Sequence, residues 1–179
     1  MTFQYDVMGT RYSGAYPGVL INVNNPHEID SGLPNATTPP TRYGDPVVNV
    51  PGTGVRPVIS TDTSIYGFLV KPYPVTDPTW PPQGFTFPEV PPTTENLNVM
   101  RQGYISVYVC NAAAKPPIQG QPVYVQVVAY GSGATAIPVG AISAFAEGTS
   151  GADAFAITGA TWATNGVDAN GFGEVRFYN

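Results

Sequence analysis

The sequence predicts an all-β protein, a jelly-roll-like sandwich or barrel with long proline-rich extended arms, and three observations support this. The chain holds 20 glycines and 20 prolines among its 179 residues, a combined share nearly twice the average of about 12%. Several short stretches alternate apolar and polar residues, as β-strands do. No stretch free of glycine and proline spaces its apolar residues as a helix does. We therefore expect short strands and turns, with negligible helix.

The first part of the chain combines candidate strands with an extended arm. Residues 2–8 and 18–24 alternate in hydrophobicity and are candidate strands. Residues 25–46 are rich in proline, which removes backbone donors, so we expect an arm here rather than the interior of a sheet. Two further strands are predicted at residues 55–60 and 65–71.

A second proline-rich stretch, residues 72–96, separates these strands from the rest of the chain. A loop of this length is uncommon in a compact protein and is usually functional. Later strands are predicted at 136–139, 141–146, 154–164 and 171–178, with turn-forming Asn-Gly pairs at 165–166 and 170–171. The predicted organisation is a single β domain over residues 1–179, made of strands and arm in 1–60, the loop 72–96 and a core region 97–179.

The strongest strand signal lies in residues 103–131, which we expect to form the centre of the sheet. Two strands there have β-branched inner faces, formed by Ile105, Val107 and Val109 and by Val123, Val125 and Val127. We expect these strands to pair with each other through the loop 111–121. Their other faces carry Tyr104, Tyr108, Tyr124 and Tyr130, which fits either cross-strand aromatic packing or a contact surface.

Both proline-rich stretches carry apolar side chains that a free arm would expose to water. These side chains are Leu33, Tyr43, Tyr73, Trp80, Phe85, Phe87 and Val90. We therefore expect the arms to dock on a neighbouring subunit or on a partner. Trp80 is the expected anchor, because buried tryptophans often dominate protein contacts.

Charge and hydrophobicity exclude several classes of function. The net charge of −5 comes without a basic cluster, whereas nucleic-acid binding needs clustered lysine and arginine. No apolar stretch of about 18 residues is present to span a membrane. The N-terminal residues lack the basic and apolar regions of a signal peptide, and a single cysteine cannot form an intrachain disulfide. Synthesis in the cytoplasm is the natural expectation.

Residues that perform catalysis or hold metals are too sparse to predict such a site. The only histidine, His27, lies in the polar arm, where we expect an exposed loop residue rather than an oriented catalytic imidazole. Cys110 is expected to be a buried, inert thiol, and one histidine with one cysteine does not make a usual zinc site. Residues 168–174 superficially match a calcium loop, but a β-turn before a strand explains them better. We expect no enzyme activity, no cofactor and no metal.

A series of motifs resembles the structural cement, or head decoration, proteins of tailed phages. The central motif is VMRQGYISV at residues 99–107, followed by PVYV at 122–125. Further matches are AYPG at 15–18, YGDPVV at 43–48, SIYGFLV at 64–70 and GEVRFYN at 173–179. Each motif is weak alone, but the series spans nearly the whole chain in the right order.

The resemblance implies a non-enzymatic virion protein on the capsid exterior, synthesised in the host cytoplasm. It would bind the major capsid protein on the assembled head and stabilise contacts between capsomers. Such families commonly form dimers or trimers, so self-association is expected as well, without nucleic acid, membrane or cofactor. The candidate interface residues are Tyr43, Tyr73, Trp80, Phe85, Phe87, Tyr104, Tyr108, Tyr124 and Tyr130.

Two other functions remain open from the residues alone. A carbohydrate-binding β-module of a phage tail or adhesin would stack sugars on Trp80, Trp162 and surface tyrosines. A hydrolase on a β scaffold would need two carboxylates that face each other across a cleft. The sequence shows no acid pair close to an aromatic platform, which counts against both alternatives.

Overall fold

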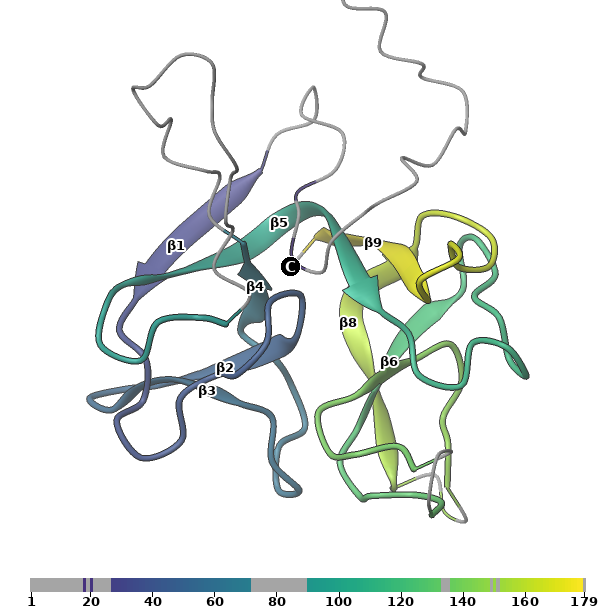
Figure 1. Cartoon of the computed structure of the whole chain (residues 1–179), viewed down its shortest axis with the longest axis horizontal. Helices are drawn as coiled ribbons and strands as arrows, with labels where there is room; N and C mark the ends of the chain where they lie inside the picture. The colour runs from purple at the N-terminus through teal and green to yellow at the C-terminus, as the bar shows by residue number, and fades with distance from the viewer. Residues whose placement is uncertain are drawn as a thin grey trace, which may run out of the picture.

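The computed structural model describes residues 18, 20, 27–71, 90–132, 136–148, 150 and 152–178. Within these residues nine strands and no helix occur, so the all-β prediction is confirmed (Figure 1). The strands are β1 (Glu28–Gly32), β2 (Pro46–Val50), β3 (Gly54–Pro57), β4 (Gly67–Val70), β5 (Leu97–Tyr108), β6 (Pro122–Gln126), β7 (Ile142–Ser143), β8 (Ala154–Trp162) and β9 (Phe172–Tyr178). They form one antiparallel sheet in the order β3-β2-β4-β5-β9-β8-β6-β7, and β1 also pairs with β5.

The expected pairing of the two central strands is wrong. β5 pairs with β1 and β4 through its first half and with β9 through its second half. β6 pairs instead with β7 and β8, so β9 and β8 lie between the two strands that the sequence pattern joined. The loop 111–121 runs toward β8, because Gly120 donates to the carbonyl of Trp162 at 2.9 Å and Trp162 donates to Gln121 at 3.0 Å.

The first half of β5 takes part in an N-terminal ring made of β1 to β5. β1 and β4 pair with the same residues of β5, so they lie along its two opposite edges. β2 pairs with β4 and β3 with β2. The chain just after β1 then returns to β3, where Val55 donates to Leu33 and Asn35 donates to Val55, both at 2.8 Å. These two bonds close the ring.

The second half of β5 takes part in a C-terminal ring with β9, β8, β6 and β7. The ring closes where β7 meets the residues that follow β5. Val109 and Ile142 form a parallel bridge, and Cys110 donates to the carbonyl of Ile142 at 2.8 Å. Figure 1 shows the two rings side by side, joined by the long curved strand β5.

β4 lies between the cores of the two rings, which explains why its sequence is a continuous apolar run. All four residues of β4 are buried. Leu69 packs with Val99 in a small core, while Phe68, Val70 and Met100 face the larger core that fills the C-terminal ring. A strand with both faces covered needs apolar side chains at every position rather than at alternate ones.

Several other expectations can be compared with the described residues. The strands predicted at 55–60, 65–71, 154–164 and 171–178 are confirmed as β3, β4, β8 and β9, although each is shorter than predicted at one end or both. The prediction of an extended arm at residues 25–46 is wrong in part, because β1 lies within this range. Glu28–Gly32 contains no proline, so its backbone can pair with β5. Residues 136–146 contribute only the short β7. The strand predicted at 2–8 and most of the loop 72–96 lie outside the described residues.

Candidate interface

Tyr104 and Tyr108 point away from the buried face of β5, and β9 brings further aromatic residues beside them. In the register of this pair Tyr104 lies opposite Arg176, and Tyr108 lies opposite Phe172. The rings of Tyr108 and Phe172 meet edge to face with centroids 6.0 Å apart, and Tyr104 meets Tyr178 in the same way at 6.3 Å. We call these five residues the β5–β9 face. Cross-strand packing is present, yet Tyr108 remains 40% exposed, so the tyrosines can also serve as contacts.

Arg42 joins this face from the N-terminal ring. Its guanidinium lies 5.7 Å from the centre of the Tyr108 ring, at the distance of a cation–π contact. The same guanidinium is paired with Asp45, with its Nη2 2.9 Å from Oδ1. Burial raises the pKa of Asp45, and the nearby Arg42 opposes that shift. The positive charge of Arg42 is therefore largely balanced within the chain.

Tyr124 and Tyr130 lie on a different surface, formed by β6 and the segment that follows it. Tyr130 exchanges two backbone hydrogen bonds with Ile137, at 3.0 and 2.7 Å. The side chain of Gln126, between the two tyrosines, is fully buried and donates to the carbonyls of Val128 and Glu147. The large apolar side chains exposed in this segment are Val128, Tyr130, Val139 and Phe145. Together with Tyr124 they are called the β6 surface below.

The β6 surface is built from a part of the chain without charge. Residues 116–146 contain no lysine, arginine, histidine, aspartate or glutamate. The charges at the two ends of this stretch neutralise each other, because Lys115 Nζ lies 2.8 Å from a carboxylate oxygen of Glu147, which is only 4% exposed. Uncharged, aromatic surface of this kind is typical of the centre of a protein interface.

The structure does not form one tyrosine-rich face from the four predicted strand tyrosines. β9 and β8 separate β5 from β6, so Tyr104 and Tyr108 belong to one surface and Tyr124 and Tyr130 to another. Tyr43 is 3% exposed and packs in the small core of the N-terminal ring, so its side chain is not part of the surface of this chain. The candidate residues Tyr73, Trp80, Phe85 and Phe87 lie outside the described residues.

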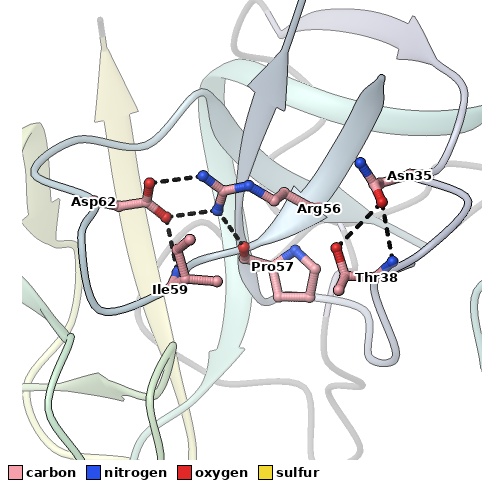
Figure 2. Close-up of polar contacts among 6 residues, drawn as sticks. All are labelled: Asn35, Thr38, Arg56, Pro57, Ile59 and Asp62. Carbon is pink, nitrogen blue, oxygen red and sulfur yellow. Dashed lines mark hydrogen bonds and ion pairs between the residues drawn. The ribbon is translucent and has the colours of Figure 1, made fainter.

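The loop after β3 ties the two rings together, and an ion pair holds its shape. Arg56 donates from both terminal nitrogens to the carboxylate of Asp62, at 2.7 and 2.8 Å, and also to the carbonyl of Pro57 (Figure 2). Asp62 in turn accepts the backbone N–H of Ile59 at 2.7 Å. Val58, between Pro57 and Ile59, is buried in the larger core. The ion pair of Arg56 with Asp62 therefore fixes a residue from the N-terminal ring in the core of the C-terminal ring.

We predict that Asp62→Asn lowers the free energy of unfolding at pH 7 by about 1–2 kcal/mol, because a charge-assisted bidentate pair is lost. Hydrogen bonding from Arg56 lowers the pKa of Asp62. A carboxylate with a lowered pKa stabilises the fold above its unfolded pKa, near 4, and this contribution is lost as the pH falls through the folded pKa. The difference between wild type and variant should therefore shrink below about pH 4.

Urea unfolding at pH 7 and pH 3 measures this difference. Glu95→Gln, which removes an exposed carboxylate outside any ion pair found among the described residues, is the matched control and should change stability little at either pH. A difference for Asp62→Asn that stays the same at both values would mean that the ion pair is not its source.

The residues considered for catalysis or metal binding lie apart from one another. His27 is half-buried rather than exposed as expected, because its imidazole packs against Gly103 of β5. Cys110 is half-buried, and burial raises the pKa of its thiol despite the nearby Arg42, which disfavours the reactive thiolate. Asp168 accepts the backbone N–H groups of Asn170 and Phe172, each at 2.9 Å, so residues 168–172 form the predicted turn.

No three histidine, cysteine, aspartate or glutamate side chains among the described residues come together as metal ligands would. No helix in this part of the chain is long and apolar enough to cross a membrane.

Sequence reasoning missed three members of the β5–β9 face, namely Phe172, Arg176 and Tyr178. The strand predicted at 171–178 already places these three residues on one side, because side chains alternate along a strand. What the sequence did not show is that β9 lies beside β5. With that register, residues about 70 positions apart form one surface.

Comparisons with known proteins find similarity to one protein family and to solved structures. The model of a protein family described as "Structural cement protein (E217 gp24/Pam3 gp6)" matches residues 3–178. Among solved structures, a chain of "The capsid of Myoviridae Phage XM1" is similar to this chain, with a TM-score of 0.63 and 21% sequence identity. The similarity covers 98% of this chain and 97% of that chain. No curated protein sequence matches.

Proposed function

This chain belongs to the structural cement protein family of phages, and from that membership we propose that it binds the outside of the assembled head and ties neighbouring capsomers together. The family match over residues 3–178 is the observation that carries the proposal. A likeness in fold to a chain of a phage capsid, over nearly the full length of both chains, supports it. The major capsid protein is the proposed partner, and the virion exterior is the proposed location.

The proposed mechanism is an addition of buried surface across the seams of the shell. A shell held by such a protein can be disrupted only if the cement contacts break as well. The β5–β9 face and the uncharged β6 surface supply aromatic and apolar contact area, which is what drives stable association. They point to two separate contacts, as a protein that joins neighbouring subunits needs. This role requires no catalysis, and self-association into a dimer or trimer would add further contacts.

Co-sedimentation tests the proposal. Emptied, expanded capsids that lack the protein are mixed with purified protein and pelleted, and the bound fraction is measured against protein concentration. Saturable binding to expanded capsids, together with greater resistance of the loaded capsids to heat or denaturant, is the expected result. Protein that stays in the supernatant at every concentration would contradict the proposal.

Trp80 remains the predicted anchor of the proline-rich stretch 72–96. We predict that Trp80→Ala weakens capsid binding by about 2 kcal/mol or more, as loss of a central tryptophan typically does. The thermal stability of the isolated protein should stay nearly unchanged, and Trp80→Phe should retain most of the binding. If Trp80→Ala instead lowers the melting temperature markedly while binding per folded molecule is kept, Trp80 belongs to the core of its own chain.

A further inference from the structure

Arg176 differs from the other arginines that the structure describes, because no carboxylate among the described residues pairs with it. Arg42 pairs with Asp45 at 2.9 Å, Arg56 with Asp62 at 2.7 Å and Arg101 with Asp30 at 3.4 Å. Arg176 forms no such ion pair among the described residues, although the chain carries 12 acidic residues and a net charge of −5. Its side chain is exposed on β9.

Tyr178 lies against the guanidinium of Arg176 without neutralising its charge. The guanidinium lies 5.2 Å from the centre of the Tyr178 ring. Tyr178 is itself fixed by the edge-to-face contact with Tyr104, at 6.3 Å and an interplanar angle of 88°. Tyr104 lies directly opposite Arg176 in the β5–β9 register. An aromatic ring attracts the guanidinium through its π-electrons, but it accepts none of the bidentate hydrogen bonds that a carboxylate would take.

From this arrangement we propose that Arg176, in contact with Tyr178, is the docking point for an aspartate or glutamate side chain of the capsid shell. The inference rests on the proposed function and names the chemistry of the partner at the β5–β9 face. A guanidinium matches a carboxylate through two parallel N–H···O bonds. Arginine and tyrosine are also the residue types that most often dominate protein interfaces.

Charge complementarity favours a carboxylate over other partners at this point. The net charge of −5 repels an acidic partner from most of the surface. An exposed arginine that pairs with no carboxylate in the described part of the chain therefore selects where such a partner can approach. The contact with Tyr178 in the free protein lowers the entropy cost of ordering the long side chain of Arg176 on binding. Arg42 is a weaker candidate on the same face, since Asp45 already occupies its guanidinium.

The test measures binding of Arg176 variants to expanded capsids by co-sedimentation. Arg176→Met keeps most of the side chain's length and removes the charge, and we expect affinity to fall about thirtyfold, as for an interface hot spot. Arg176→Lys keeps the charge but loses the planar guanidinium that forms two parallel hydrogen bonds, so an intermediate loss of affinity is expected. The control Gln121→Glu makes the same change in net charge at an exposed position in the loop before β6 and should leave affinity within about twofold. Circular dichroism and melting curves check that each variant is folded.

Salt dependence separates a specific ion pair from general electrostatics. The affinity of the wild type should fall as sodium chloride rises from 50 to 500 mM, because salt screens the ion pair. The affinity of Arg176→Met should fall less steeply, since this variant cannot form the pair. If Arg176→Met binds capsids with the same affinity as the wild type, this inference is overturned and the cement function still stands. Failure of the wild type itself to bind would overturn both. Unchanged capsid binding with a lost signal on a glycan array would assign the face to a carbohydrate instead.

Discussion

Trp162→Ala should lower the free energy of unfolding by about 3–5 kcal/mol, the typical loss for a buried tryptophan. Trp162 is 1% exposed at the end of β8 and packs in the larger core. Gly173 on β9 leaves room for the indole, since a Cβ there would lie 2.9 Å from Trp162 Cζ3. The backbone of Trp162 also holds the loop 111–121. Truncation to alanine leaves a cavity that these surroundings can fill only in part.

Chemical denaturation followed by circular dichroism measures this loss. For a chain of this length, about 4 kcal/mol corresponds to a fall in melting temperature of about 10 °C. Ile118→Ala is the control, because Ile118 is 49% exposed and lies in the same loop region, and it should change stability by no more than about 0.5 kcal/mol. A loss below about 1 kcal/mol for Trp162→Ala would show that the indole is not a central part of the core.

The second large effect is expected for Gly103→Ala, which we predict to destabilise the protein by about 2–4 kcal/mol. Gly103 lies in the middle of β5 with a φ of 137°, a backbone conformation that residues with a Cβ rarely adopt. A Cβ there would also overlap the imidazole Cδ2 of His27. β5 joins the two rings at this point, so a shift of Gly103 disturbs the pairing with β1 on one side and β9 on the other.

A double-mutant cycle separates the two causes. His27→Ala alone should cost little and should leave capsid binding unchanged. Combined with Gly103→Ala, it removes the overlap and should recover part of the lost stability, while the strain at φ 137° stays. Urea midpoints of the four proteins measure the coupling. Additive losses of stability would mean that backbone strain alone explains the effect of Gly103→Ala. If Gly103→Ala leaves stability unchanged, β5 tolerates a residue with a Cβ at this position.

The sequence by itself determined most of the local structure. Alternation in residues 104–109 and 123–127 correctly assigned the buried valines and isoleucine, because side chains of a strand point to its two faces in turn. The motifs along the chain also led to the correct family, which the match over residues 3–178 shows. Proline content was a poorer guide in residues 25–46, since the proline-free Glu28–Gly32 within them is a strand.

Only the tertiary structure decided which strands lie side by side. The pairing of β5 with β9 brings Tyr104 next to Arg176, and the separation of β5 from β6 divides the four tyrosines between two surfaces. Side-chain alternation is a local property, but strand order depends on backbone hydrogen bonds and core packing between segments far apart in the chain. For the same reason the sequence showed seven lysines and arginines but not their ion pairs. The pair between Arg101 and Asp30, for example, forms only when β1 pairs with β5.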